Sequence, residues 1–349
     1  MRVHINQINE GNILLKDVLS ASGKPLMRKH TVLKRELIDV LHAFLIETVD
    51  IESSSETEQD KNVSSDKSAT PFGAVYHAAV QGYKKLYADW HSGASVDISK
   101  VRNLLIPAVE HILQHPSEVF KTTGYAGEED YLYHQSVSAA LLSASLAKFS
   151  GFPHGDVIQI AMTGLLCDCG LTKLDQGFIQ KKRALTAKEF DEIKQHPVHS
   201  YKMLKNIVSL KEAVKIGVLQ HHERMDGSGY PLGTKGDQLH PYGKIAALAH
   251  AYQAMVSTRP YRDRQSPFHV LEQLMEDEFG RFDLSALKAL RKGLLTFSSG
   301  TIVRLSDGRT AEIVFIEDQQ PARPLVKLQD SGEMIALKEY RQLYIEEIL

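Results

Sequence analysis

The sequence predicts a mainly α-helical protein in which a helical bundle is flanked by a small N-terminal α/β module and a small C-terminal β-barrel-like module. Apolar residues recur at helical spacing between residues 71 and 295, a polar stretch covers 52–70, and short alternating segments follow residue 298. A chain of 349 residues exceeds the usual size of one domain, so we expect several folding units.

Residues 1–51 are predicted to form the α/β module. Val3 and Ile5 alternate with polar residues as in a strand, whereas Leu37 and Leu41 share one face of a helix. The following residues, 52–70, are mostly Ser, Glu, Asp and Lys. This composition is typical of a flexible linker, because it offers too little apolar surface to form a core.

Residues 71–295 are predicted to form one helical domain, because no strand pattern interrupts them. Tyr76, Ala79 and Tyr83 mark the buried face of a first helix, and a second helix follows from Ile98, with a kink expected at Pro107. Further helices are expected at 130–150, 155–167, 187–206, 210–222, 243–257 and 267–277.

Residues 298–349 carry the signals of a small β module. The turn Ser306-Asp307-Gly308 predicts a hairpin, and about five short strands suggest a barrel or curled sheet. The expected strands are 302–305, 311–316, 325–328, 334–337 and 344–348.

The charge and cysteine content exclude several classes of protein. The 41 Lys and Arg residues nearly balance the 43 Asp and Glu residues, so no basic field favours nucleic acid or an anionic membrane. No apolar run is long enough to span a bilayer. The two cysteines, Cys167 and Cys169, cannot form a disulfide framework, so we expect a reduced, cytoplasmic protein.

The histidines carry the strongest chemical signal. His221 and His222 are adjacent and lead into a glycine-rich loop, while Asp168 ends an apolar run in which an unpaired carboxylate is costly. His196 and His250 can converge on the same point inside a helical bundle. Together these residues predict a site for Fe, Mn or Zn, although single histidines are more often hydrogen-bonded core residues.

Residues 118–291 resemble the HD-GYP domain, a family of HD-type metal-dependent phosphodiesterases that cleave cyclic di-GMP. The signature HHExxDGxGYP is matched in full from His221 to Pro231. A second tract matches at Leu185-Thr186, Glu189, Ile193-Lys194 and His196-Pro197, and a third matches at Arg259-Pro260-Tyr261-Arg262. Because these motifs occur in the family's order, the resemblance is specific, and it implies an HD-type helical bundle.

The resemblance also implies the residues of the active site. Asp168 is the implied catalytic residue, and a divalent transition metal, Fe or Mn, is held by Asp168, His196, His221 and His222. The substrate is cyclic di-GMP or a related cyclic dinucleotide. The implied substrate-binding residues are Arg259, Arg262, Tyr230 and Gly229.

Several positions depart from the family pattern. Gln135, Cys167 and His250 replace three ligands of the family's second metal, and Leu171 replaces its lysine. A thiolate at Cys167 and a neutral imidazole at His250 can bind a soft metal, which would give an altered second site. The alternative, which we favour, is that Cys167 is a small buried residue and His250 a core histidine, leaving one ion per chain.

Three functional hypotheses follow. The first is a cyclic di-GMP phosphodiesterase. The second is a catalytically inactive module that binds a cyclic dinucleotide or a protein partner, the latter through the loop that contains Gly229-Tyr230-Pro231 (the GYP loop) or through the flanking modules. The third is a scaffold in which the flanking modules act and the bundle forms a homodimer.

Overall fold

The protein is described here from a computed structural model. The chain forms two compact units, Met1–Ser64 and Ser65–Leu349. The structure describes residues 2–5, 8, 12–19, 25–29, 31–34, 37–38, 40–41, 46, 48–52, 71–125, 130–179, 186–257, 265–276, 280–294, 300–317 and 320–349. All of the expected linker except Glu52 therefore lies outside the described residues.

The first unit contains a small antiparallel sheet. Strand β5 (Thr48–Glu52) lies between β1 (Arg2–His4) and β2 (Ile13–Leu14), and β3 (Val18–Leu19) pairs with β4 (Pro25–Met27). Residues 37–38 and 40–41 are helical, as the α/β prediction requires. Leu14, Leu33 and Leu41 are fully buried in the core of this unit.

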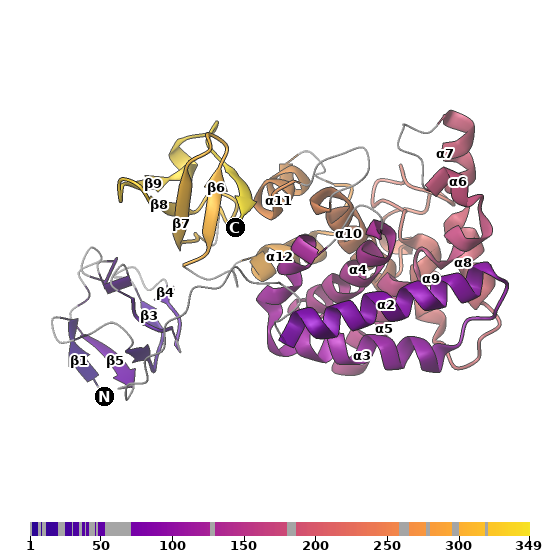
Figure 1. Cartoon of the computed structure of the whole chain (residues 1–349), viewed down its shortest axis with the longest axis horizontal. Coiled ribbons are helices and arrows are strands. Elements are labelled where there is room, and N and C mark those ends of the chain that lie inside the picture. The colour runs from indigo at the N-terminus through magenta and orange to yellow at the C-terminus, as the bar shows by residue number, and fades with distance from the viewer. Residues whose placement is uncertain are drawn as a thin grey trace. The chain divides into compact units, whose positions relative to one another are not determined.

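The second unit is built mainly of helices (Figure 1). The α-helices are α2 (Pro71–His91), α3 (Ile98–Gln114), α4 (Tyr131–Phe149), α5 (His154–Leu166), α6 (Gln176–Ile179), α7 (Ala187–Ile193), α8 (His196–Leu204), α9 (Glu212–Gln220), α10 (Pro241–Val256), α11 (Pro267–Glu276) and α12 (Leu284–Leu294). Short 3₁₀ helices are η3 (Pro116–Tyr125), η4 (Cys169–Lys173) and η5 (Gly236–Gln238).

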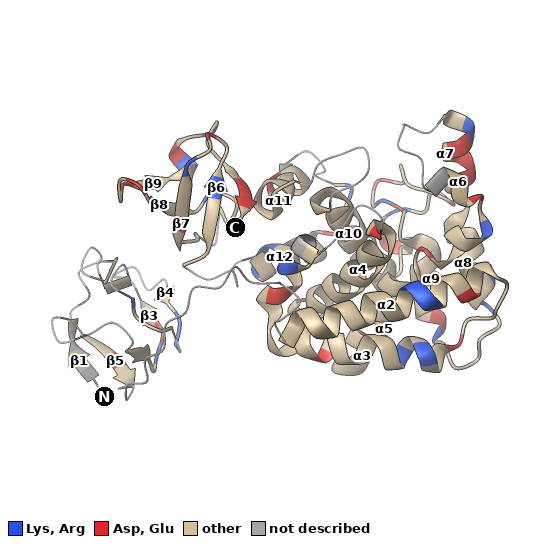
Figure 2. Cartoon of the chain, in the orientation of Figure 1, with Lys and Arg blue, Asp and Glu red and all other residues tan. Residues whose placement is uncertain are grey.

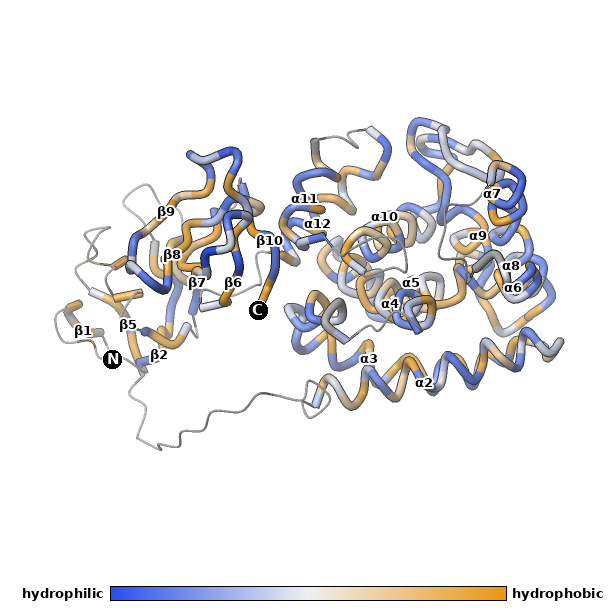
Figure 3. The backbone as a smooth tube through the Cα atoms, turned by 45° about the horizontal axis from the view of Figure 1, so that its top comes forward, coloured by the Kyte–Doolittle hydropathy of each residue, from blue (hydrophilic) through white to orange (hydrophobic). Residues whose placement is uncertain are grey.

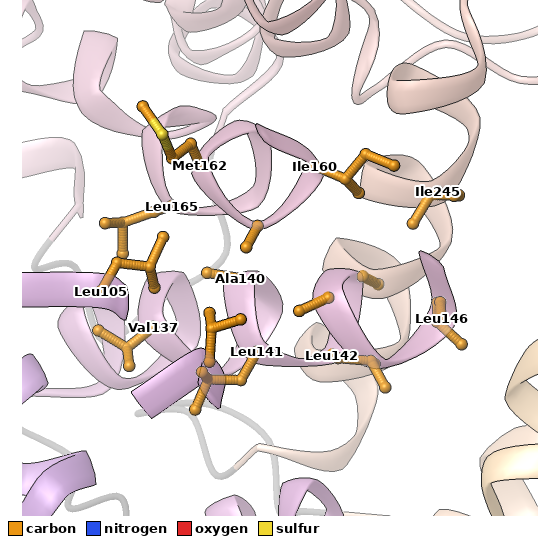
Figure 4. Packing of buried hydrophobic residues seen from close by; sticks show 14 of the residues in the cluster. Leu105, Val137, Ala140, Leu141, Leu142, Leu146, Ile160, Met162, Leu165 and Ile245 are labelled. Atoms are coloured by element: carbon orange, nitrogen blue, oxygen red, sulfur yellow. The ribbon is translucent and has the colours of Figure 1, made fainter. Parts of the chain in front are cut away.

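Helix α4 forms the centre of the bundle and packs against α2, α3, α5, α10 and α12. Its residues 134–147 are all buried, and Lys148 is its only Lys, Arg, Asp or Glu residue, so α4 is almost entirely tan in Figure 2. Figure 4 shows Val137, Leu141 and Leu142 of α4 among side chains of the neighbouring helices. A helix that is apolar on every side is stable only inside a core, which explains this position.

Helices α2 and α3 are amphipathic and cover the bundle. In Figure 3 their tubes change repeatedly between orange and blue, as expected when one face packs and the other meets water. Asp97 caps α3, because its carboxylate accepts hydrogen bonds from the backbone N–H groups of Ser99 and Lys100. The helix runs through Pro107 without ending there.

The helix expected at 187–206 is interrupted. It divides into α7 and α8, with Gln195 as the N-cap of α8 and Pro197 in its first turn. A proline lacks the N–H that would continue the α7 hydrogen-bond ladder, so a new helix starts at His196. Helix α12 was not among the expected elements. Its buried face includes Ala286 and Ala289, which weaken the periodic signal of large apolar residues.

The C-terminal residues form an open five-stranded sheet in the order β10-β6-β7-β8-β9. The strands are β6 (Ile302–Leu305), β7 (Thr310–Phe315), β8 (Leu325–Leu328), β9 (Met334–Ala336) and β10 (Ile345–Ile348). A small β module is thus confirmed, but its sheet is not closed into a barrel. Closure requires β9 to pair with β10, and β9 has only three residues before a 3₁₀ helix (η6, Leu337–Glu339) begins.

Helix α11 contacts this sheet. Phe268 is buried in the core of the sheet. Arg323 forms a bidentate ion pair with Glu272, with N–O distances of 2.8 and 3.0 Å. Among the described residues, no helix has the length and apolar character needed to cross a membrane.

Candidate metal centre

Four potential metal ligands meet inside the helical unit. Asp168 lies between α5 and η4, His196 is the first residue of α8, and His221 and His222 directly follow α9. One ligand atom from each side chain lies within 4.8 Å of the other three, and no other such group occurs among the described residues. Elements separated by more than 50 residues therefore place one carboxylate and three imidazoles at a single point.

Close backbone packing places Asp168 beside His196. A Cβ atom at Gly170 would lie 2.3 Å from the His196 carbonyl oxygen and 2.4 Å from the Ser200 nitrogen, so only glycine permits this approach. The Ser200 hydroxyl accepts a hydrogen bond from the Gly170 N–H at 2.8 Å and donates one to the Cys167 carbonyl at 2.7 Å. Together these contacts fix η4 against the first turn of α8.

Hydrogen bonds orient two of the imidazoles. The Nδ1–H of His196 donates to the Ile193 carbonyl and that of His221 to the Val218 carbonyl, both at 2.7 Å. In the neutral form of either ring, the lone pair therefore lies on Nε2. The two Nε2 atoms are 3.1 Å apart, a distance at which two lone pairs repel unless a proton or a cation lies between them.

The charge states also suit metal binding. Burial and then the neighbouring imidazoles lower the pKa of His221 and of His222 well below the usual value, so both rings are neutral near pH 7. Burial by itself would raise the pKa of Asp168, but the neighbouring imidazoles of His250 and His196 lower it by more. The resulting pKa is well below the usual value, and the carboxylate is ionised.

These residues fit a divalent transition metal. Neutral imidazoles and an ionised carboxylate are the forms that bind metals, and the backbone hydrogen bonds at Nδ1 are the outer contacts common to metal-binding histidines. A single negative charge at a buried site also favours a cation as its counterpart.

Comparison with known proteins supports this assignment. The model of the HD domain family matches residues 108–285, more than half of the chain. This chain belongs to the HD domain family. Residues over 70% of the chain are 27% identical to cyclic di-GMP phosphodiesterase PA4108 of Pseudomonas aeruginosa, covering 58% of that protein. Cyclic di-GMP phosphodiesterase PdeB of Borreliella burgdorferi is 28% identical over 59% of the chain and 55% of its own length.

The chain thus spans between half and two thirds of the length of these relatives. A solved structure, the HDGYP protein Bd1817 from Bdellovibrio bacteriovorus, aligns with 83% of this chain and 97% of its own, with a TM-score of 0.51 and 13% identity, which supports the fold. The resemblance to HD-GYP proteins expected from the sequence motifs is confirmed.

The altered half of this HD domain is arranged differently. The His250 Nε2 lies 3.0 Å from Asp168 Oδ2 and 3.1 Å from the Gln135 side-chain nitrogen. Both Gln135 and His250 are therefore next to the cluster, but neither belongs to the group of four.

Neither Cys167 nor Leu171, which stands where the family has a lysine, contributes to the cluster. The Cys167 thiol donates to the Thr163 carbonyl at 3.1 Å within its own helix, and burial raises its pKa well above the usual value. It is therefore a protonated thiol turned away from Asp168. Leu171 is buried, and the nearby Lys173 donates to the Trp90 carbonyl at 3.0 Å.

The GYP loop packs directly on the cluster. The Tyr230 ring stacks on His222 with centroids 4.5 Å apart and an interplanar angle of 19°. A Cβ atom at Gly229 would lie 2.4 Å from both the Glu223 Cα and the His222 carbonyl oxygen, so this glycine allows the loop to reach the histidines. Glu223 holds the loop, because its Oε1 accepts a hydrogen bond from the Leu232 N–H at 2.7 Å.

The sequence analysis missed two supporting residues, Gly170 and Ser200. The sequence carries no local signal for Ser200, whose contacts join segments 30 or more residues apart. Arg259 and Arg262, the two implied phosphate-binding arginines, lie outside the described residues.

Proposed function

We propose that this protein is a metal-dependent phosphodiesterase that hydrolyses cyclic di-GMP or a related cyclic dinucleotide. The observation that carries the proposal is the convergence of Asp168 with three histidines directly beneath the GYP loop. The names of the two relatives support the substrate class, since both are cyclic di-GMP phosphodiesterases.

Each residue then has a defined task. Asp168, His196, His221 and His222 hold the metal, with Asp168 as the catalytic carboxylate. The ion, Fe or Mn, supplies Lewis-acid activation of water and of the phosphodiester. Tyr230 and Gly229 shape the substrate side, since the Tyr230 ring covers His222. Arg259 and Arg262 neutralise the phosphates by charge-assisted hydrogen bonds.

We propose one ion per chain. The second half of the site offers His250, whose Nε2 lies 3.0 Å from Asp168 Oδ2, Gln135, whose side-chain nitrogen lies 3.1 Å from that Nε2, and a Cys167 thiol that faces Thr163. None of these three side chains is a free anionic ligand.

The same observation favours a second candidate function, a cyclic dinucleotide receptor without hydrolytic activity. Hydrolysis in two-metal sites depends on a nucleophile activated by both ions. A site with His250 in place of a metal-binding carboxylate keeps the architecture for binding while its catalytic power is reduced.

One exposed side chain beside this site supports the prediction of a protein partner. Leu232 follows the GYP tripeptide and is 65% exposed, so the loop offers an apolar contact to a protein partner. Contacts through the flanking modules, a homodimer and a cytoplasmic location remain predictions.

An anaerobic turnover assay separates the two functions. Wild-type protein and His222→Ala would be loaded with Fe(II) or Mn(II) and given cyclic di-GMP, with binding measured by calorimetry on the same preparation. Turnover that His222→Ala lacks supports the phosphodiesterase. Binding without turnover supports the receptor. The absence of both would overturn both functions. His134→Ala, a buried histidine outside the cluster, serves as the control.

A further inference from the structure

We infer that His250 is a positioning residue for the metal ligand Asp168: it holds one carboxylate oxygen so that only the other faces the three histidines. This inference rests on the proposed metal centre and assigns a task to a residue outside its four ligands.

The hydrogen bond fixes the roles of both groups. The His250 Nε2 lies 3.0 Å from Asp168 Oδ2, and because a carboxylate oxygen accepts hydrogen bonds, the ring nitrogen is the donor in this contact. A nitrogen that carries this proton has no lone pair for a metal. The side-chain amide of Gln135 lies beside the same nitrogen, at 3.1 Å.

The contacts of Asp168 are divided between its two oxygens. Oδ1 faces the metal-binding imidazoles, 3.4 Å from His196 Nε2 and 3.8 Å from His221 Nε2, whereas Oδ2 faces His250. Without a partner at Oδ2, the carboxylate could rotate about its Cβ–Cγ bond and present either oxygen to the ion. The His250 contact selects one orientation before the ion arrives.

The fold holds the His250 ring in place. Its centroid is 5.2 Å from that of His221 and 5.0 Å from that of His222, and only 9% of the residue is exposed. Its helix, α10, approaches α9 closely, since a Cβ atom added at Gly243 would lie 3.6 Å from the Gly217 Cα. The donor is therefore rigid, as an outer-shell contact must be if it is to orient a ligand.

Two other interpretations of His250 fit less well. A histidine that only fills the core needs no buried carboxylate as its partner; His134, a buried histidine outside the cluster, instead contacts the Tyr76 hydroxyl at 2.9 Å. A ligand of a second ion would need a free Nε2 and anionic neighbours, but this nitrogen is in hydrogen-bond contact with Asp168 Oδ2 and the Cys167 thiol bonds to Thr163.

Metal affinity tests the inference. Mn(II) binding to the full chain would be measured by calorimetry for wild type, His250→Ala and His250→Gln. We expect His250→Ala to bind Mn(II) about 10- to 100-fold more weakly, the usual effect of losing an outer-shell partner. His250→Gln should recover most of the affinity, since its amide N–H can reach Oδ2. His134→Ala, a control of similar burial, should bind as wild type does.

The outcomes separate failure of the inference from failure of the metal centre. Wild-type affinity in His250→Ala would overturn the positioning role alone. Weak Mn(II) binding by both His250→Ala and His250→Gln would show that the hydrogen bond to Asp168 is not what supports metal affinity. This conclusion requires that melting of the metal-free proteins shows both variants folded. A wild-type protein without measurable affinity for Mn(II) or Fe(II) would overturn the metal centre and this inference with it.

Discussion

Replacing Gly170 with alanine should separate the metal ligands without altering any of them. The new Cβ atom would lie 2.3 Å from the His196 carbonyl oxygen and 2.4 Å from the Ser200 nitrogen, and real Cβ contacts essentially never fall below 3.0 Å. Both neighbours are backbone atoms and cannot move aside as a flexible side chain would. Either η4 or α8 must therefore shift, and these elements carry Asp168 and His196 at their ends.

The required movement follows from these distances. Restoring a 3.0 Å contact from 2.3 Å needs a displacement of about 0.7 Å, whereas metal–ligand distances tolerate only about 0.2 Å. Overpacking of this kind costs about 1–3 kcal/mol, and weakening the two Ser200 hydrogen bonds adds about 1 kcal/mol each. We expect a loss of about 3–5 kcal/mol in unfolding free energy and at least a tenfold loss of metal affinity.

Urea unfolding and Mn(II) calorimetry measure the two effects separately. Gly155→Ala is the matched control, because its Cβ would meet no atom within 4 Å and its backbone is compatible with alanine. The reasoning would be refuted if Gly170→Ala bound Mn(II) as tightly as wild type and as Gly155→Ala.

Three further predictions concern the GYP loop, a buried histidine and the C-terminal sheet. Gly229→Ala should displace Tyr230 from His222 and weaken cyclic di-GMP binding at least tenfold, because its Cβ would lie 2.4 Å from backbone atoms; unchanged calorimetric affinity would contradict this. Burial lowers the pKa of His134 from 6.5 to about 4, so the unfolded chain takes up this proton first as pH falls. The unfolding free energy should therefore drop by about 1–2 kcal/mol between pH 7 and 5, after allowance for partial solvent access. In His134→Gln, the unfolding free energy measured by urea titration should lose this part of its pH dependence. Arg323→Met should cost about 3 kcal/mol, because Glu272 and the Arg341 and Leu343 carbonyls lose their donor, and an unchanged melting temperature would exclude this role.

The metal centre could be predicted largely from local patterns. Asp168, His196 and the adjacent His221 and His222 stand in recognisable motifs, and the structure brings all four together. The spacing of Tyr76 and Tyr83 likewise identified α2, because a long amphipathic helix repeats the same signal over several turns.

Features that depend on distant contacts could not be predicted in this way. Nothing near Ser200 indicates that its hydroxyl joins α8 to η4, and nothing near His250 indicates which Asp168 oxygen it meets. The open edge of the C-terminal sheet follows from the short β9, whose length depends on where η6 begins rather than on the strand pattern. Helix α12 was missed because small buried residues such as Ala286 carry little hydrophobic signal.

The metal content of the purified protein tests the central claim most directly. Protein prepared anaerobically without chelator would be analysed for Fe and Mn, alongside His222→Ala and the His134→Ala control. The cluster of Asp168 with three histidines predicts about one ion per chain in wild type and in His134→Ala, and almost none in His222→Ala. A wild-type protein that contains no ion and takes none up from added Fe(II) or Mn(II) would contradict the account.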